Sequence, residues 1–239
     1  MICPNRLVIM SKVPRPGRVK RRLQPQLSGD EAATLYAALV QDLVEALGAD
    51  ERWDLAVHFA PAEDLAAARA WLGENVSLYA QSGFDLGARM RAAVNLAFEQ
   101  GCERVVVIGG DTPDIAAGLV AEAFLALADH DLVLGPSRDG GYYLIGLRDA
   151  APEVFEDMPW GTGAVLSRTL ERASRMRLST KLLAELEDID SWEDLCRLRH
   201  RLHDTGPAGL STPLLRTRSA VRGIFLERDD QPGSEKGSS

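Results

Sequence analysis

The stretch RVVVIGGDTPDI, residues 104–115, decides the fold class of this 239-residue chain. Residues 105–108 are all β-branched and apolar, which predicts a strand with both faces buried. Asp111 follows behind two glycines, and the stretch after it predicts a helix over 115–129 with Asp114 as its N-cap. A fully buried strand that leads into a helix is typical of a parallel sheet covered on both faces.

The same alternation extends on both sides of this stretch. Other predicted strands lie at 6–10, 54–60, 76–81, 131–137, within 139–147 and within 180–186. Other predicted helices lie at 28–49, 62–73, 85–101, 162–176, 191–203 and 212–228. This pattern predicts an α/β fold with a largely parallel sheet, in which ligands bind beyond the carboxyl ends of the strands. We expect one domain over 1–228 and, because its composition is polar and glycine-containing, a disordered tail over 229–239.

Several helix starts carry a capping signal. Ser28, with Glu31 three residues on, predicts a capping box. Thr162, Ser191 and Thr212 are expected to cap the later helices through their hydroxyl groups.

The composition argues against a nucleic-acid-binding, membrane-spanning or disulfide-rich secreted protein. The net charge is −8 and 46% of the residues are hydrophobic, which supplies a core but no broad basic surface for nucleic acid. No apolar run approaches about 18 residues, so no membrane span is predicted. The N-terminus lacks the features of a signal peptide, and the three widely spaced cysteines argue against a disulfide framework. We therefore expect a cytoplasmic protein.

The positive charge is concentrated after the first strand. Residues 1–28 hold seven Lys and Arg and no Asp or Glu, whereas the rest of the chain holds 20 basic and 35 acidic residues. Six of the seven lie in the proline- and glycine-broken loop SKVPRPGRVKRRL, residues 11–23. Several cations and free N–H groups at one point suit a phosphate-bearing small molecule. The alternative is a solvated basic loop without a ligand.

Acidic residues follow later elements and predict a metal site. A carboxylate at the end of an apolar strand costs free energy unless it is paired or binds a cation, so Asp111 is a candidate Mg²⁺ or Mn²⁺ ligand. Asp188 or Asp190, in the stretch EDIDSWEDL, could complete the site with Asp111. The alternative for that stretch is a solvated acidic turn.

Two further loops follow strands and carry polar residues. Gly83, Asp85 and Arg89 could contact a nucleoside, although Asp85 could equally cap the next helix. Arg138, Asp139 and the glycine pair 140–141 could meet a sugar, an acceptor or a phosphate, and the alternative there is an ordinary hairpin turn.

Five motifs in one order carry a family resemblance: KVPRPGRVKRRL, IGGDTPDI, LGPSRDGGYYLIGL, PWGT and DIDSWEDL. Together they resemble a bacterial family of candidate glycosyltransferases related to the GT-A nucleotide-diphospho-sugar transferases. More distantly, the chain is similar to the molybdenum-cofactor and phospholactate guanylyltransferases. The resemblance spans about residues 6–203. It implies a GT-A fold, which is a three-layer α/β/α domain with a mixed but mostly parallel sheet.

The resemblance also implies roles for the residues of the site. Asp111, Lys20 and Asp139 would be catalytic, and Asp111 would hold Mg²⁺ or Mn²⁺ with Asp190 or Asp188. The nucleotide and its phosphates would contact Lys12, Arg15, Gly17, Arg18, Lys20, Arg22, Gly83, Asp85 and Arg89. The acceptor would lie against Arg138, Gly140, Gly141 and Tyr142.

The leading hypothesis is a metal-dependent glycosyltransferase that takes a nucleotide-diphospho-sugar and an acceptor that the sequence does not identify. The alternative is a guanylyltransferase-like nucleotidyltransferase that releases pyrophosphate from a nucleoside triphosphate, and the number of loop cations favours it. A non-catalytic nucleotide-binding protein would have less need of carboxylates at both 111 and 188 or 190. Nucleic-acid binding is the least favoured hypothesis, because the body of the protein is acidic.

Overall fold

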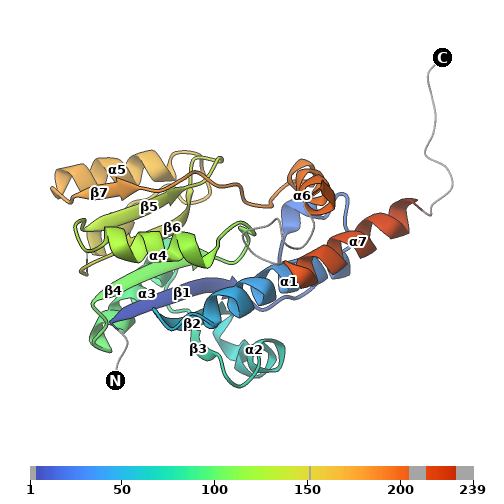
Figure 1. Cartoon of the computed structure of the whole chain (residues 1–239), viewed down its shortest axis with the longest axis horizontal. Helices are drawn as coiled ribbons and strands as arrows, with labels where there is room; N and C mark the ends of the chain where they lie inside the picture. The colour runs from blue at the N-terminus through green and yellow to red at the C-terminus, as the bar shows by residue number, and fades with distance from the viewer. Residues whose placement is uncertain (1–3, 151, 205–213, 230–239) are drawn as a thin grey trace, which may run out of the picture.

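The computed structural model describes residues 4–150, 152–204 and 214–229 around a seven-stranded sheet (Figure 1). The strands are β1 (Asn5–Lys12), β2 (Asp54–Ala60), β3 (Ser77–Ala80), β4 (Arg104–Gly109), β5 (Leu132–Pro136), β6 (Tyr142–Leu147) and β7 (Thr180–Leu182). Their order in the sheet is β3-β2-β1-β4-β6-β5-β7. Only β6 runs antiparallel to its neighbours β4 and β5, so the predicted mixed, mostly parallel sheet is confirmed.

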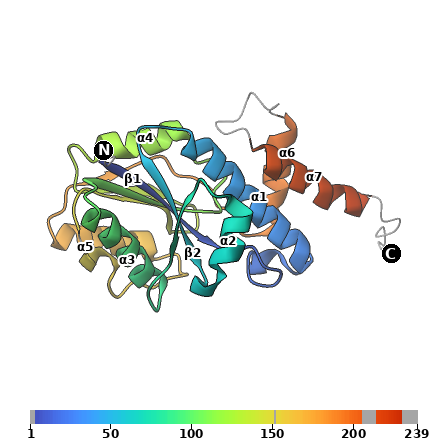
Figure 2. The same ribbon diagram turned by 90° about the horizontal axis from the view of Figure 1, so that it is seen from below.

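Helices cover both faces of this sheet, as Figure 2 shows from below. The α-helices are α1 (Gly29–Gly48), α2 (Leu65–Leu72), α3 (Leu86–Glu99), α4 (Ala117–Ala126), α5 (Val165–Arg175), α6 (Trp192–Asp204) and α7 (Leu215–Asp229). Three short 3-10 turns are η1 (Arg21–Leu23), η2 (Ala62–Asp64) and η3 (Pro152–Phe155). None of the helices in the described part of the chain is long and apolar enough to cross a bilayer.

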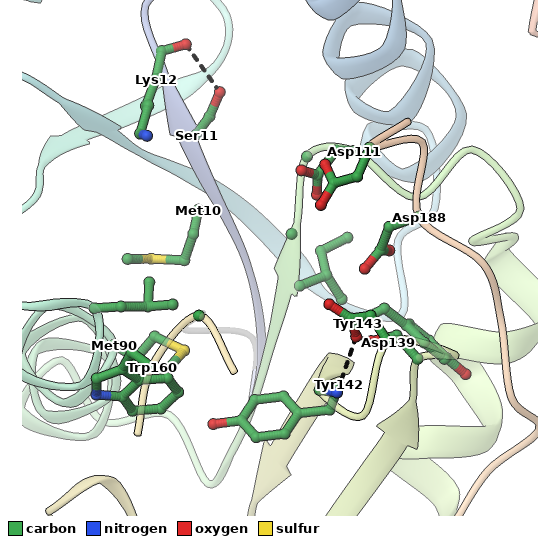
Figure 3. Close-up of a pocket in the computed structure, with 18 of the residues that line it drawn as sticks. Met10, Ser11, Lys12, Met90, Asp111, Asp139, Tyr142, Tyr143, Trp160 and Asp188 are labelled. Carbon is green, nitrogen blue, oxygen red and sulfur yellow. Dashed lines mark hydrogen bonds between the residues drawn. The ribbon is translucent and has the colours of Figure 1, made fainter. Parts of the chain in front are cut away.

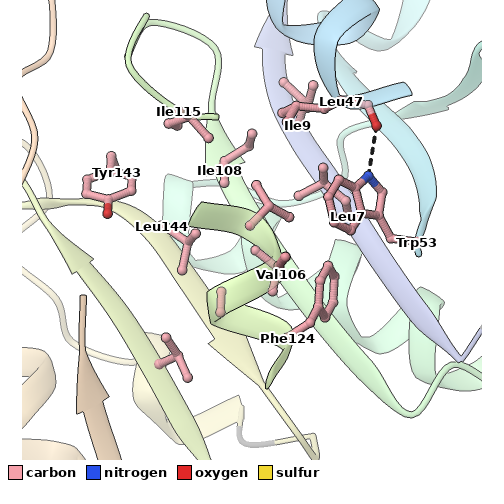
Figure 4. Packing of buried hydrophobic residues seen from close by; sticks show 14 of the residues in the cluster. Leu7, Ile9, Leu47, Trp53, Val106, Ile108, Ile115, Phe124, Tyr143 and Leu144 are labelled. Atoms are coloured by element: carbon pink, nitrogen blue, oxygen red, sulfur yellow. Dashed lines mark hydrogen bonds between the residues drawn. The ribbon is translucent and has the colours of Figure 1, made fainter. Parts of the chain in front are cut away.

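The central strands divide their side chains between two apolar layers because successive residues of a strand point to opposite faces. In β4, Val106 and Ile108 pack with Phe124 of α4, and this layer also contains residues of α1. Figure 4 shows that packing, together with the Trp53 indole, which donates to the Leu47 carbonyl at 2.9 Å. Val105 and Val107 enter the other layer, under α3 and α5. The three-layer α/β/α architecture follows from this alternation.

The C-terminal helices form a separate apolar cluster with α1, and α7 lies along α1 in Figure 1. Polar contacts fix the pairing: the Arg228 guanidinium lies 2.6 Å from Glu31, and the Thr217 N–H donates to Asp42 at 2.8 Å. Leu23, at the end of the basic loop, is fully buried in the same cluster. The last described helix therefore supports the first loop of the site.

Some of the predicted helix N-caps form in the structure and others do not. The Ser28–Glu31 capping box forms, Ser191 accepts from the Asp194 N–H at 3.2 Å, and Asp85 accepts from the Ala88 N–H at 2.7 Å. Two expectations are wrong. Helix α4 begins at Ala117 rather than behind Asp114, whose carboxylate pairs with Arg201 at 2.5 Å. Helix α5 begins at Val165, and the Thr162 hydroxyl donates to the Pro159 carbonyl instead of capping it. Thr212 and the predicted tail, apart from Asp229, lie outside the described residues.

Candidate active site

A cavity of about 570 Å³ opens at the carboxyl ends of β1 and β4. Open, mostly parallel sheets hold their ligands at this edge. Figure 3 shows Asp111, Asp139 and Asp188 on one side of the cavity, with Met90 and Trp160 on the other. The cavity therefore has a charged part and an apolar part.

The basic loop is held in place by its apolar residues. Val19 is 3% exposed and packs against α1, while Leu23 is fully buried against the C-terminal helices. Gly17 adopts a φ of +76°, and Lys20 itself adopts a left-handed φ of 44°. The buried side chains of Val19 and Leu23, one on each side of Lys20, hold the loop so that the Lys20 side chain points inward. This lysine is therefore not a solvated surface residue.

Lys20 is the centre of the charged part of the cavity. Its side chain is 3% exposed, and Nζ lies 3.1 Å from Asp111 Oδ2 and 3.2 Å from Asp190 Oδ1. Burial opposes the ammonium charge, but the charges and hydrogen bonds of the two carboxylates outweigh it and raise the pKa of Lys20. The same ammonium lowers the pKa of Asp111 against the effect of burial. Arg22 Nη1 lies 3.3 Å from the other Asp190 oxygen.

Tyr36 of α1 connects the first strand to this charged part. Its hydroxyl lies 3.1 Å from Ser11 Oγ and accepts from the Lys12 N–H at 3.0 Å. Burial and the nearby Asp111 carboxylate raise the pKa of Tyr36, so it stays a neutral phenol. Nothing in the sequence marks Tyr36 as a site residue, because an aromatic residue in an amphipathic helix resembles an ordinary core residue.

Asp188 joins the late acidic segment to the end of β4. It accepts a hydrogen bond from the Thr112 hydroxyl, and the Ile189 N–H donates to the Asp111 carbonyl at 3.2 Å. Burial, followed by the charge of Asp111, raises the pKa of Asp188 to about 6. Three carboxyl groups therefore share one end of the cavity, and one of them releases its proton late.

The turn after β5 holds Asp139 rigidly. Asp139 Oδ1 accepts from the Ser137 hydroxyl at 2.6 Å and from the Gly141 N–H at 2.9 Å. Gly140 adopts a φ of +86°, and a Cβ there would overlap the Gly163 carbonyl. The turn is thus pressed against the start of α5, which fixes the position of the carboxylate.

The cavity brings together most, but not all, of the predicted site residues. Those that line it are Lys12, Arg18, Lys20, Arg22, Arg89, Asp111, Asp139, Gly141, Tyr142, Asp188 and Asp190. Those that do not are Arg15, Gly17, Gly83, Asp85, Arg138 and Gly140.

The charged residues outside the cavity have other partners. Arg15 pairs with Asp64, Asp85 caps α3, and Arg138 lies 3.1 Å from Glu187. The structure also adds lining residues that the sequence analysis did not assign, among them Tyr36 and Gln81. Gln81 Nε2 donates to the Ser11 and His58 carbonyls at 2.8 and 2.7 Å, which ties β1 to β2 at the cavity edge.

The carboxylates fit a divalent cation that arrives with a phosphate ligand. No group of three or more His, Cys, Asp or Glu side chains is arranged for a metal in the described ranges. Asp111 and Asp190, however, already share one cation, the Lys20 ammonium, and their side chains are 38% and 40% exposed. Two carboxylates with phosphate oxygens are a donor set that Mg²⁺ commonly uses.

The cavity lies where folds of this type bind ligands, and comparison with known proteins identifies the chain as a transferase. Residues 43–162 match the model of a family described as an uncharacterized protein conserved in bacteria, DUF2064. The match covers half of the chain, and the chain belongs to this family.

Two curated relatives are named guanylyltransferases. A phosphoenolpyruvate guanylyltransferase of Sphaerobacter thermophilus is 27% identical over 203 residues, which cover 84% of this chain and 94% of that protein. A 3-phospho-D-glycerate guanylyltransferase of Phenylobacterium zucineum is 34% identical over 141 residues, which cover 56% of this chain and 62% of that protein.

Solved structures confirm the fold. A candidate nucleotide-diphospho-sugar transferase from Desulfovibrio desulfuricans G20 has a TM-score of 0.82 and 36% identity, covering 93% of this chain and 99% of its own. A CMP:2-keto-3-deoxy-manno-octonic acid synthetase, solved with CTP, has a TM-score of 0.54 and covers 84% of this chain and 98% of its own. Its identity is 11%, so that likeness concerns the fold alone. The two curated relatives and the Desulfovibrio desulfuricans G20 structure confirm the expectation of a transferase and support one that uses a nucleotide.

Proposed function

We propose that the protein is a nucleotidyltransferase, which moves a nucleoside monophosphate from a nucleoside triphosphate to an acceptor and releases pyrophosphate. The observation that carries the proposal is the buried Lys20 ammonium between Asp111 and Asp190, in a cavity also lined by Lys12, Arg18, Arg21 and Arg22. A triphosphate carries more charge than the diphosphate of a nucleotide sugar, so this many cations suit it better. The two guanylyltransferase relatives support the same choice over the sugar transfer that the sequence motifs favoured.

In this reaction the cations of the basic loop and the carboxylates of Asp111 and Asp190 have different roles. The loop cations bind the β- and γ-phosphates, and Lys20 offsets the negative charge that develops on the leaving pyrophosphate. A divalent ion held by Asp111 and Asp190 would add to that charge compensation. The rigid contacts of Val19, Leu23 and Tyr36 keep these groups in place before the substrate arrives.

The test is a transfer assay with a panel of triphosphates. The full chain is incubated with GTP, CTP, ATP or UTP and with Mg²⁺, Mn²⁺ or EDTA, and the acceptors include phosphoenolpyruvate, 3-phosphoglycerate and simple alcohols. Pyrophosphate release and the mass of the product are measured, and binding of each triphosphate is followed by thermal shift. We expect one triphosphate to stabilise the protein most, with a further increase on adding metal. If none of the four shifts the melting temperature with or without metal, the proposal is wrong.

Sugar transfer is the second candidate, because the candidate nucleotide-diphospho-sugar transferase from Desulfovibrio desulfuricans G20 resembles this chain over nearly its whole length. That reaction would release a nucleoside diphosphate rather than pyrophosphate. Including UDP-glucose and GDP-mannose in the same assay separates the two reactions by their leaving groups.

A further inference from the structure

The two walls of the cavity differ in charge. Five of the six Lys and Arg side chains in residues 11–22 line one wall of the cavity. The opposite wall, built by β6, the turn before it and residues 160–165, contains no Lys or Arg among its described lining residues. Its ionisable acid is Asp139, and Asp188 lies nearby (Figure 3). Asp139 and Asp188 would repel a phosphorylated carboxylic acid at that wall, and the one lining cation that the structure describes outside residues 11–22 is Arg89, next to Met90 on α3.

The uncharged part of this wall is apolar and aromatic. The Tyr142 and Trp160 rings meet edge to face with their centroids 6.4 Å apart. Met10 and Met90 lie on the same side of the cavity as Trp160 in Figure 3. Gly87 lets the indole approach α3, since a Cβ there would lie 2.8 Å from Trp160 Cζ2. The ring is therefore wedged in position, as expected for a surface that holds a flat or bulky apolar group.

Asp139 supplies the one charged group of this wall. Its Oδ1 is used by Ser137 and Gly141, and within the described part of the chain its Oδ2 has no hydrogen-bond or ion-pair partner. A fixed carboxylate oxygen across the cavity from the Trp160 ring can accept a hydrogen bond from a substrate hydroxyl. It can also take the proton of that hydroxyl.

We propose that the acceptor is an alcohol with an apolar or aromatic body, an inference that rests on the proposed nucleotidyl transfer. The alcohol oxygen attacks the α-phosphorus and forms the new P–O bond. The bond from the α-phosphorus to the bridging oxygen breaks, and pyrophosphate leaves with the electron pair. The hydroxyl proton passes to Asp139 and then to water. On this point the chain differs from the two guanylyltransferases, whose names specify phosphorylated acids.

The inference is tested on the full chain saturated with its best triphosphate and Mg²⁺. The probes are 2-phenylethanol and 4-nitrobenzyl alcohol on one side, and 3-phosphoglycerate and phosphoenolpyruvate on the other. Binding is measured by saturation-transfer NMR and transfer by product mass. We expect the alcohols to bind and to be preferred at least about tenfold in kcat/KM. Trp160→Phe should raise KM for the alcohols about fivefold and leave the KM of the triphosphate unchanged.

Asp139→Asn separates the proton-accepting role from a structural one, because an amide oxygen still accepts from Ser137 and Gly141. We expect a loss of about 100-fold in kcat with the KM of the triphosphate and the melting temperature retained. Glu185→Gln, an exposed carboxylate that does not line the cavity, is the matched control and should leave kcat unchanged.

Three outcomes overturn the inference: tighter binding of the phosphorylated acids, no binding of either class, or a KM for the alcohols that Trp160→Phe leaves unchanged. Failure of the triphosphate itself to bind would instead contradict the proposed function.

Discussion

The Lys20 ammonium lies 3.1 Å from the Asp111 carboxylate, although the two residues are 91 positions apart in the chain. The contact joins the loop after the first strand to the end of the central strand. Asp190 completes it at 3.2 Å. Removing any of these three groups should change either the stability of the protein or its response to nucleotides.

Lys20→Met should destabilise the protein by about 1–3 kcal/mol near pH 7, because Asp111 and Asp190 lose their common cation but remain partly hydrated. The raised pKa of Lys20 gives stability that is fully present below its ordinary value of 10.5 and lost as the pH rises through the folded pKa. The lowered pKa of Asp111 gives stability that is present above 3.8 and lost as the pH falls through its folded pKa. Urea unfolding between about pH 5 and 9 should therefore show the full effect. Arg21→Met, an exposed cation of the same loop, should change stability by less than about 0.5 kcal/mol.

Asp111→Asn should remove the dependence of nucleotide binding on a divalent metal. An asparagine at 111 still accepts a hydrogen bond from Lys20, so the fold is retained while the metal loses an ionised ligand. Thermal shifts with triphosphate should keep their metal-free component and lose the increment due to Mg²⁺ or Mn²⁺. The matched control is Asp114→Asn, three residues on, which pairs with Arg201 and does not line the cavity. A metal increment that survives Asp111→Asn would show that Asp111 is not a ligand.

Asp188→Asn should stabilise the metal-free protein at pH 7.5 by about 1–3 kcal/mol. The pKa of Asp188 is raised from 3.8 to about 6, so the folded state holds its proton after the unfolded state has lost it. Wild-type stability therefore declines as the pH rises from about 4 to 6, and the variant escapes that decline. Denaturant unfolding with EDTA at pH 4 and pH 7.5 measures the difference, which should nearly vanish at pH 4. An equal difference at both pH values would mean that ionisation of Asp188 is not its source.

Gly140→Ala should destabilise the protein by about 2 kcal/mol or more and lower transfer activity. The position combines a φ of +86° with an overlap of the new Cβ and the Gly163 carbonyl, so the turn that carries Asp139 must move. Gly118→Ala is the matched control, because that helical glycine has nothing within 4 Å of the new Cβ. It should be neutral or stabilising by up to about 1 kcal/mol. Melting temperatures and kcat of the two variants provide the comparison.

Glu31→Gln should loosen α7 and cost about 1 kcal/mol at pH 7. The hydrogen bond from Arg228 lowers the pKa of Glu31 from 4.5 to about 2. This contribution is present above pH 4.5 and is lost as the pH falls toward 2, so wild type and variant should converge in acid. Hydrogen exchange of α7 provides a local readout. Glu63→Gln, an exposed carboxylate of η2, should leave that exchange unchanged.

The sequence was sufficient to predict most of the fold, because an apolar run such as 105–108 can be satisfied only between two covered faces. It was not sufficient to place the start of α4. The Asp114 carboxylate forms an ion pair with Arg201, 87 residues away in the sequence, instead of capping α4. A capping rule that considers only neighbouring residues cannot predict this contact. The antiparallel direction of β6 agrees with the hairpin turn that residues 138–141 allowed and with the mixed sheet that the family resemblance implies.

The sequence predicted those site residues that directly follow a predicted strand. Lys20 and Asp111 lie beyond the carboxyl ends of β1 and β4, which the α/β pattern anticipates. Arg15 is a cation of the same loop as Lys20, yet its side chain pairs with Asp64 outside the cavity. The path of the proline-containing backbone determines which cations of the loop face the cavity, and the sequence alone does not give that path. Tyr36 was missed because its partners, Ser11 and Lys12, lie on another element.

Asp190 follows Lys20 by 170 residues. Protein chains fold from the N-terminus as they leave the ribosome. A chain synthesised only through β4 already contains Lys20 and Asp111, yet it lacks the carboxylate that completes their contact and the helices that bury Leu23. A nascent chain that ends at β4 therefore cannot hold its basic loop in the arrangement of the folded protein, and the cluster is complete only after Asp190 and the helices that follow it have been synthesised.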